Sequence, residues 1–513
     1  MTEPPRTEAT LPSLIASLAA DYGDSVLSLT VLFHPDPRRI GAWYETPLGQ
    51  HGGTLELGRL QPVFCSRSGE EAALGEGHVS RQALQLHYNR NGLRLQRRAG
   101  ACACRLDGLA LGDEVFSLDR DALNSGCVLQ LGHALVLWLH CGPARGAQRA
   151  EVAPDLLGSG AAMCALRQQI ARVGPTDLDV LILGETGTGK EEVATALHRV
   201  SDRAREPLVP INMAAIPAGL APSLLFGSVR GAYTGAAASR GYFRQAEGGT
   251  LFMDEIGATA AEIQPQLLRA LQQRQVQVVG GALEAVNVRV IAATDSDLDA
   301  ADSNFSSALR YRLGSIEVLL PPLRERREDL GELLLAFLRR EAAVLDAHSL
   351  LPGSGADPML AAGWAEVIQR LARYDWPGNV RELANTARQL LLGGDGGLVM
   401  PAALEARLQG GAEKAPQENS VNAPAAVAVS VDDFRAAHTA AEFEVAATAR
   451  RLGVSRQAVY RRLQESGFRL ASEVSEDELA AALAEANGDV RRAALALRVS
   501  AQGLRARLRQ RGR

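Results

Sequence analysis

The sequence contains almost no lysine. Of its 54 basic residues, only Lys190 and Lys414 are lysine, and the other 52 are arginine. A lysine that persists against so strong a preference indicates chemistry that needs a compact ammonium group rather than a planar guanidinium. Lys190 therefore becomes a candidate functional residue if its neighbours support one.

Long apolar runs are also missing. The longest, from Cys127 to Cys141, contains Gln130 and His133 and is shorter than the 18 or more apolar residues that a membrane-spanning helix requires. We interpret it as two buried strands. The stretch 11–20 is interrupted by proline and serine and does not resemble a signal peptide. These absences predict a cytoplasmic protein with no membrane partner.

Length, charge and cysteine content limit which class of protein this sequence can encode. A chain of 513 residues, 46% hydrophobic and 22% charged, predicts a globular protein of roughly three domains. The net charge of −5 gives no overall sign of nucleic-acid binding, so any contact with DNA must be local. The six cysteines lack metal-binding spacing, and Cys102 and Cys104 alternate as in a strand, which favours reduced thiols.

The periodicity of the sequence changes along the chain. Short alternating runs from Val26 to about Gly142 predict an antiparallel sandwich, and apolar strands alternating with helices from about Asp155 predict a parallel α/β core. We expect strands at 27–33, 84–88, 93–96, 128–131, 180–183, 251–254 and 288–292, and helices at 191–199 and 263–273. The predicted organisation is multidomain: an extension 1–24, an all-β sandwich 25–143, an α/β core 155–320, a helical lid 321–395, a linker 396–430, and two all-α repeats 431–470 and 471–513.

A glycine-rich loop follows the strand Val180–Leu183 and precedes a helical stretch. This context is the one that a phosphate-binding loop requires, because glycines let backbone amides surround phosphate oxygens and a lysine neutralises the terminal phosphates. The lysine is Lys190, so the rarity of lysine argues against the alternative of an ordinary loop. The predicted nucleotide-binding residues are Gly184, Glu185, Thr186, Gly187, Thr188, Gly189, Lys190 and Glu191.

A second signal for nucleotide chemistry lies 64 residues after Lys190. The apolar run Gly248–Met253 ends in the paired acids Asp254 and Glu255. Asp254 would hold Mg²⁺, and Glu255 would polarise the attacking water. The alternative is a pair of carboxylates at a helix start, but the two motifs together favour an ATP-binding enzyme.

At this point the chain resembles the AAA+ domain of sigma-54-dependent activators, also called bacterial enhancer-binding proteins. The resemblance covers about Asp155 to Leu392, and its most specific piece is similar to the family's GAFTGA loop with tyrosine for phenylalanine. It implies an ATP- and Mg²⁺-dependent ATPase that acts as a hexameric ring and contacts the sigma-54 RNA polymerase holoenzyme. Tyr233 and Thr234 would be the contact pair in this loop, which comprises Gly231, Ala232, Tyr233, Thr234, Gly235 and Ala236.

Further landmarks of the family follow in order. Asn212 matches the asparagine that couples the catalytic glutamate to the nucleotide state. The segment Pro321–Arg326 matches the entry into the helical lid. The segment Trp376–Leu383 matches the lid signature, in which Arg381 would sense the phosphates as sensor II.

The chain departs from the family at two catalytic positions. Sensor I is usually asparagine, but here it is Asp295, whose carboxylate would repel the γ-phosphate and cannot donate a hydrogen bond unless protonated. The first arginine finger is replaced by Ser306. Arg312 aligns with the second finger, and Arg310 is a candidate replacement for the first, each reaching a neighbouring subunit's phosphate.

The C-terminal repeats are similar to the Fis-type helix-turn-helix domain. Residues 431–513 hold 15 arginines against 11 acids, a local charge of +4 that favours DNA binding. Upstream enhancer DNA is the implied partner, and the alternative is a pair of plain helical hairpins with solvated arginines. The predicted DNA-binding residues are Ser455, Arg456, Gln457, Arg461 and Arg462 in the first copy and Ser500, Gln502 and Arg505 in the second.

The N-terminal sandwich resembles a forkhead-associated (FHA) domain. Arg59 and Ser80 match its phosphothreonine ligands, which implies a phosphothreonine protein as a partner. Ala83 stands where that family has histidine, and Cys102 where it has asparagine. These departures bear on phosphopeptide binding more than on the fold.

The combined prediction is an ATP-dependent, DNA-binding transcription activator that remodels sigma-54 polymerase and is regulated through the FHA-like domain. Asp295 and Ser306 keep open a second reading, a DNA-bound regulator that senses nucleotide but hydrolyses it poorly. A chaperone or unfoldase of the AAA+ class is disfavoured by the segment 231–236.

Overall fold

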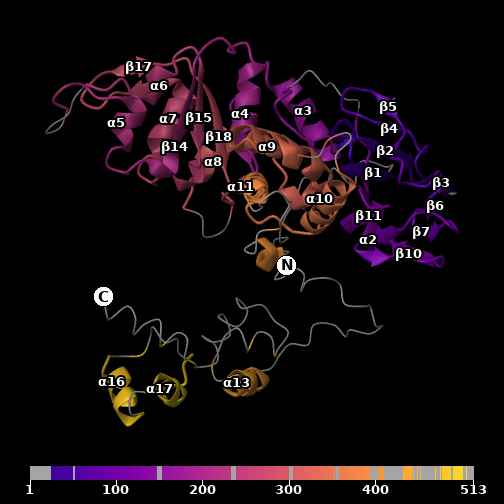
Figure 1. Ribbon diagram of the computed structural model, residues 1–513. Helices are drawn as coiled ribbons and strands as arrows, with labels where there is room; N and C mark the ends of the chain where they lie inside the picture. The colour runs from indigo at the N-terminus through magenta and orange to yellow at the C-terminus, as the bar shows by residue number, and fades with distance from the viewer. Residues whose placement is uncertain are drawn as a thin grey trace, which may run out of the picture. The chain divides into compact units, whose positions relative to one another are not determined.

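The computed structural model forms two units, residues 1–415 and 416–513 (Figure 1). In the first unit it describes residues 25–49, 52–146, 153–232, 238–299, 304–351, 357–392 and 404–408, with Gly353 and Met400. In the second it describes 431–441, 476–486, 489–500 and a few single residues.

Two antiparallel sheets form the sandwich of residues 25–143. The eight-stranded sheet has the order β5-β4-β2-β1-β12-β11-β8-β9 and the four-stranded sheet the order β10-β7-β6-β3. β1 (Ser25–Phe33) pairs with β12 (Leu135–Pro143) along its length. The remaining elements are β2 (Trp43–Pro47), β3 (Gly53–Leu57), β4 (Phe64–Cys65), β5 (Glu71–Ala72), β6 (Leu84–Asn89), β7 (Gly92–Arg97), β8 (Cys104–Leu106), β9 (Leu109–Ala110), β10 (Val115–Asp119), α2 (Arg120–Ser125) and β11 (Cys127–Leu131).

The inner faces of the two sheets bury one apolar core. The stretch 127–141 forms two buried strands, β11 and β12, as predicted from its interruption by polar residues. The prediction of a strand from Cys102 was wrong, because β8 begins only at Cys104. The amide of Cys102 donates to Ser80 Oγ at 2.8 Å, so this backbone is bonded to a loop instead of a neighbouring strand.

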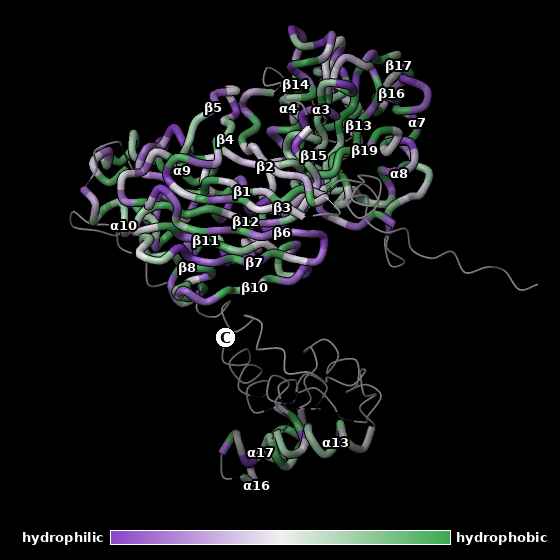
Figure 2. The backbone as a smooth tube through the Cα atoms, turned by 90° about the vertical axis from the view of Figure 1, so that its right-hand side faces the viewer, coloured by the Kyte–Doolittle hydropathy of each residue, from purple (hydrophilic) through white to green (hydrophobic). Residues whose placement is uncertain are grey.

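A five-stranded parallel sheet forms the α/β core, with the order β14-β15-β18-β13-β19. Apolar clusters cover both of its faces, and the strands are coloured as hydrophobic in Figure 2. All five strands end at the same edge, where α/β proteins bind ligands. The elements are α3 (Ala161–Val173), β13 (Val180–Leu183), α4 (Lys190–Arg199), β14 (Leu208–Asn212), α5 (Ala221–Phe226), α6 (Tyr242–Gln245), β15 (Thr250–Asp254), α7 (Gln264–Gln273), β16 (Gln275–Gln277), β17 (Leu283–Ala285), β18 (Arg289–Thr294), α8 (Ser307–Leu313) and β19 (Ile316–Leu319).

Three helices follow as the lid: α9 (Leu330–Leu345), α10 (Pro358–Leu371) and α11 (Asn379–Leu392), preceded by the short turns η4 (Leu323–Glu325) and η5 (Arg327–Asp329). Residues 404–408 are also helical, and Leu404 is fully buried in the lid core. The sequence placed them in a linker that begins at 396. The lid extends further because an apolar side chain there completes its core.

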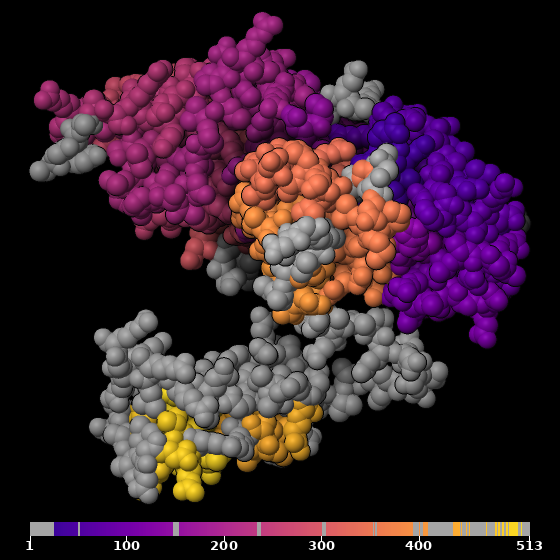
Figure 3. All heavy atoms as spheres, viewed as in Figure 1, coloured from indigo at the N-terminus to yellow at the C-terminus, as the bar shows by residue number. Residues whose placement is uncertain are grey.

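The sandwich and the lid share one hydrophobic core, although the sequence separates them by the whole α/β core. Phe33 and Trp138 of the sandwich belong to the same buried cluster as Leu334 and Trp364 of the lid. A side chain at Gly331 would collide with the backbone of Leu32, since an added Cβ would lie 2.1 Å from its carbonyl oxygen. Figure 3 shows the lid against the sandwich on one face of this unit.

The second unit contains α13 (Val431–Ala440), α16 (Glu476–Glu485) and α17 (Val490–Leu497). α16 and α17 bury a small core with Val499 and Leu504. Among the described helices of the whole chain, none is both long and apolar enough to span a membrane.

Candidate nucleotide-binding site

The glycine-rich loop connects the end of β13 to the start of α4 at Lys190. Gly187 and Gly189 have φ of +79° and +105°, which L side chains rarely adopt, so the glycines permit this reversal. Lys190 Nζ donates to the carbonyl oxygens of Gly184 at 2.9 Å and Glu185 at 3.4 Å. The ammonium group is thus held over the loop, where terminal phosphates would replace the carbonyls as its partners.

The paired acids lie at the same edge of the sheet. β15 ends at Asp254, and Asp254 Oδ1 accepts a hydrogen bond from the Glu255 amide at 3.0 Å. Burial and the nearby Asp295 raise the pKa of Glu255, while Lys190 opposes this shift. Asn212 is the register partner of Asp254 on the neighbouring strand. A carboxyl group with a raised pKa beside a lysine suits a base that accepts a proton from water.

Asp295 follows β18 directly and faces the loop. Thr186 Oγ1 donates to its carboxylate, and this bond lowers the pKa of Asp295 despite partial burial. The side chain therefore stays ionised near Lys190 and Glu255. A carboxylate at this position adds negative charge where a phosphate would bind.

The lid contacts four consecutive residues of the loop. Arg324 donates to both carboxylate oxygens of Glu185, and Asn379 donates to Glu185 and to the Thr186 carbonyl. The Arg381 amide donates to Gly187 O at 3.2 Å, and Arg326 Nη2 donates to Thr188 O at 2.9 Å. Sequence reasoning gave a role only to Arg381. The others lie in the two lid segments it recognised, but their contacts with the loop depend on the fold.

Arg381 also lines a cavity of about 350 Å³ together with Glu382 and Arg407. Arg407 pairs with Glu382 at 3.0 Å. The cavity therefore lies where α11 meets the segment 404–408, beside the loop contact of the Arg381 backbone.

The two predicted finger arginines lie on α8 and are bound within their own chain. Arg310 pairs with Glu317 at 2.7 Å and with Asp299 at 3.2 Å. Arg312 donates to Leu271 O at 2.9 Å and lies 3.4 Å from the carboxylate of Asp179. A role in a neighbouring subunit would require either side chain to exchange these partners.

Gly231 and Ala232 are the described part of the predicted sigma-54 contact, and Tyr233, Thr234, Gly235 and Ala236 lie outside the described residues. The two ends of the segment are joined by paired backbone bonds between Ser228 and Ser239 at 3.0 and 2.9 Å. The backbone of Val279 pairs with the same segment at Ser228, so three stretches of chain meet at this base. The base of the segment is therefore fixed to the body of the domain.

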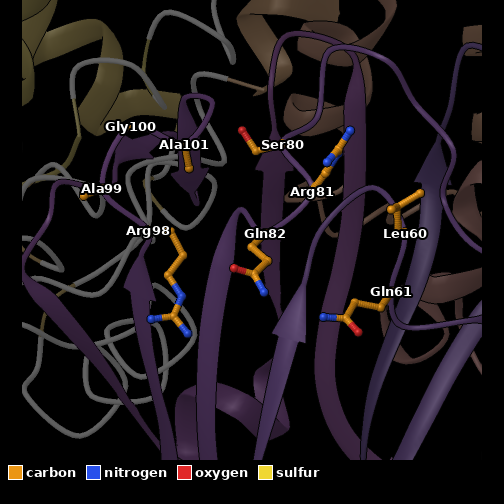
Figure 4. Close-up of a pocket in the computed structure, with 9 residues that line it drawn as sticks. All are labelled: Leu60, Gln61, Ser80, Arg81, Gln82, Arg98, Ala99, Gly100 and Ala101. Carbon is orange, nitrogen blue, oxygen red and sulfur yellow. The ribbon is translucent and has the colours of Figure 1, made fainter.

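A separate pocket of about 910 Å³ opens at one end of the sandwich (Figure 4). Ser80 lines it and accepts the Cys102 amide, while Arg59 instead bonds Gly77 O at 3.4 Å and is absent from the lining. Arg81 and Arg98 supply the cations. The sequence pattern that predicted Ser80 as a ligand also contains Arg81, but neither Arg81 nor Arg98 was predicted as a ligand.

Most of the predicted DNA-binding residues lie outside the described part of the chain: Ser455, Arg456, Gln457, Arg461, Arg462, Gln502 and Arg505. Ser500 is described, and its carbonyl accepts from the Leu504 amide at 3.0 Å. Arg498, directly after α17, has φ of +54°, a left-handed conformation that often ends a helix.

Comparison with known proteins agrees with this geometry. Residues 156–319 match the family described as the sigma-54 interaction domain, and residues 324–421 match the AAA+ ATPase lid domain. Residues 156–319 are thus similar to the sigma-54 interaction domain family, and the central region is an AAA+ ATPase with a helical lid. The match of the lid to residue 421 agrees with the burial of Leu404 in the lid core.

Similar curated proteins are transcription regulators. The chain is 46% identical to HyfR of Escherichia coli over 46% of this chain and 34% of that one, and 46% identical to NtrC of Klebsiella pneumoniae over 46% and 49%. It is 39% identical to DctD of Pseudomonas aeruginosa over 63% and 66%. The chain thus spans about a third to two thirds of the length of these relatives.

A solved structure of NtrX from Brucella abortus in complex with ATP is 29% identical, covering 61% of this chain and 69% of that one with a TM-score of 0.42. The assignment of the sigma-54 interaction domain rests on the family matches and the curated relatives.

Proposed function

We propose that the protein hydrolyses ATP to remodel RNA polymerase that carries sigma-54, and so opens promoters. The observation that carries this proposal is the sequence Gly231–Ala236, which lies between Ser228 and Ser239, two residues whose backbones are paired. An aromatic residue between small residues on a fixed base suits a finger that presses on a partner. The sigma-54 interaction domain family and the transcription regulators among the relatives support the same partner.

In this proposal the nucleotide site works through its own residues. Lys190 and the loop amides bind the phosphates of ATP, Glu255 orients and deprotonates the attacking water, and Asn212 links Glu255 to the nucleotide state. Asp254 would hold Mg²⁺, which neutralises charge on the β- and γ-phosphates when bound. The residues present suit Mg²⁺, which prefers one or two carboxylates together with phosphate oxygens. This edge of the sheet provides the carboxylates, and a bound nucleotide would provide the phosphates.

The active form would be a hexameric ring, because Arg310 and Arg312 are proposed to act on a neighbouring subunit's nucleotide. Their ion pairs with Glu317 and Asp179 would be exchanged for phosphate on assembly. Sedimentation with a γ-phosphate mimic tests this: closed rings support it, and monomers at every concentration contradict it.

The C-terminal unit is proposed to bind upstream DNA through a helix-turn-helix. The turn at Arg498 and the small core of α16 and α17 are consistent with such a module. Its arginines would provide the phosphate contacts. A partner that is RNA polymerase bound to DNA places the protein in the cytoplasm.

The sandwich is proposed to be an FHA-like regulatory domain that binds a phosphothreonine protein at the pocket beside Ser80. Arg81 and Arg98 give that pocket the charge that a phosphate group needs. Because the sandwich and lid share a core, a ligand on the sandwich would act on the ATPase through the lid.

The central experiment measures ATP turnover with and without purified sigma-54 polymerase and a promoter fragment. Tyr233→Ala should abolish open-promoter formation and leave hydrolysis intact, since the loop contacts the partner and not the nucleotide. Phe116→Ala, which removes an exposed aromatic of the sandwich, is the control and should retain both activities. Normal promoter opening by Tyr233→Ala would refute the loop assignment.

A second candidate is a DNA-bound regulator that senses ATP but hydrolyses it poorly. The ionised Asp295 beside Thr186 favours it, because negative charge near the γ-phosphate opposes the transition state. Steady-state hydrolysis at rising protein concentration separates the two: cooperative turnover supports remodelling, and none at any concentration supports the sensor.

A further inference from the structure

The phosphate-binding loop is held from one side over residues 185–188 by the lid and the turns that lead into it. The lid contacts described above come from two segments: η4 with Arg326, and the first turn of α11. The Lys190 ammonium group, by contrast, donates to the loop carbonyl oxygens of Gly184 and Glu185. The loop is therefore bound on its outer side by the lid, while its lysine stays available to phosphate.

Asn379, the first residue of α11, connects the phosphate-binding loop, η4 and α11. Its side chain is fully buried, and its backbone has φ of +52°, a conformation that asparagine tolerates better than most residues. Asn379 Oδ1 accepts the Leu323 amide at 2.8 Å, which fixes the amide orientation because a backbone N–H can only donate. Its Nδ2 then donates to Glu185 Oε2 and to Thr186 O, each at 3.1 Å.

Asparagine fits this position because it provides one acceptor and two donors. Aspartate would keep the acceptor for Leu323 but would set a second carboxylate against Glu185. Alanine would leave the buried Leu323 amide without its acceptor, which costs free energy, and would remove both bonds to the loop. The contact pattern therefore requires an amide at Asn379.

Arg324 makes the second connection. Its two terminal nitrogens lie 2.8 and 2.5 Å from the two oxygens of Glu185, a bidentate geometry that fixes the carboxylate in direction as well as position. Glu185 is thus shared between the two lid segments. A movement of either segment would move the loop backbone with it.

We propose that Asn379 and Arg324 are positioning residues that hold the phosphate-binding loop to the lid through Glu185, so that the lid position sets the loop's affinity for nucleotide. Neither residue needs to contact the nucleotide. The inference depends on ATP binding at the loop, and not on sigma-54 as the partner.

The test uses the full chain and a charge exchange. Asn379→Asp should weaken binding of a fluorescent non-hydrolysable ATP analogue by about tenfold, since a lost buried hydrogen bond with added repulsion is of this order. Glu185→Gln in the Asn379→Asp background removes the facing pair of carboxylates and restores a donor opposite an acceptor, and the amide oxygen of the new side chain still accepts from Arg324. The double variant should recover binding to within about threefold of the original chain.

The matched control is Asn91→Asp, the same substitution at an exposed turn of the sandwich, which should leave the affinity unchanged. Wild-type affinity in Asn379→Asp, or no recovery in the double variant, overturns the proposal, because a general loss of stability would not be repaired by Glu185→Gln. Unfolding midpoints without nucleotide are recorded for each variant.

Should Asn379→Asp fail to fold, Arg324→Ala takes its place, since this side chain is 39% exposed and its removal leaves little buried space. A several-fold weaker affinity supports the proposal, and an unchanged affinity refutes it. A chain that fails to open promoters but shows the charge-exchange recovery would refute the proposed function and leave this inference intact.

Discussion

The nucleotide site and the sandwich pocket both offer cations to a phosphate group, but they are built in different ways. In the first, the loop is one continuous segment between β13 and α4, and Lys190 is 7% exposed. In the second, Ser80 and Arg81 come from one loop and Arg98 from another, and Arg98 is already paired with Glu56. A site contained in one continuous segment can be recognised as a motif in the sequence. In a site assembled from several loops, single residues can be replaced without loss of the fold, so no such motif is left.

The two sites also differ in how they connect to the rest of the unit. The phosphate-binding loop is bonded to the lid by Arg324, Arg326 and Asn379. The sandwich contributes Phe33 and Trp138 to the core of the same lid, and the Arg327 guanidinium lies 5.8 Å from the Trp138 ring. The lid is therefore the element through which the two sites would influence each other.

The largest effect is expected at the nucleotide site. Lys190→Ala should reduce ATP hydrolysis by roughly 10²–10³-fold, because the only cation on the loop that faces the terminal phosphates is lost. Turnover is measured at saturating ATP. Lys414→Ala, at the one other lysine of the chain, is the control and should retain full activity. Equal losses of activity in both variants would contradict a specific role for Lys190.

The shared core is tested next. Trp138→Ala should lower the free energy of unfolding by about 3 kcal/mol, since it removes a buried ring that packs on both sandwich and lid. Calorimetry should show one transition for the sandwich and ATPase in the original chain and two in the variant. Phe116→Ala, at an exposed position of the sandwich, is the control, and a single unshifted transition in Trp138→Ala would contradict a shared core.

A pH effect of intermediate size is expected where the sandwich, lid and α3 meet. Asp329 is fully buried and accepts the Gly160 amide, and burial together with Glu328 raises its pKa from 3.8 to about 7. The folded state then keeps a proton that the unfolded state releases, so this stability is complete below about pH 4 and is lost as the pH rises to about 7.

Urea unfolding at pH 5 and pH 8 measures this dependence. Asp329→Asn should reduce the loss of stability between the two values, and Asp121→Asn, at an exposed helix position, should not. An identical slope in Asp329→Asn would show that other groups cause the pH dependence.

The smallest effect is expected in the sandwich pocket. Ser80→Ala should cost about 1 kcal/mol of unfolding free energy, because the Cys102 amide loses its acceptor. ATP hydrolysis should be unchanged without a bound peptide. Ser117→Ala on the exposed strand β10 is the control, and a cost near zero for both serines would mean that water replaces the Ser80 hydroxyl.

Much of the fold followed from the sequence pattern. The predicted strand 180–183 agrees with β13, and the helix predicted from 191 begins one residue earlier, at Lys190. These elements were predictable because apolar periodicity and glycine-rich turns act over a few residues. The strand predicted at Cys102 was wrong because a hydroxyl 22 residues away, on Ser80, takes its amide.

The sequence alone determined the type of chemistry at the loop: Lys190, Asp254 and Glu255 are specified by motifs whose spacing requires a strand, a turn and a helix in succession. Only the tertiary structure decided what holds that chemistry in place. Glu185 meets Asn379 across 194 residues, and Trp138 meets the lid across the whole α/β core. Such contacts leave no local pattern, because burial and hydrogen bonding between distant segments depend on how the chain folds back on itself.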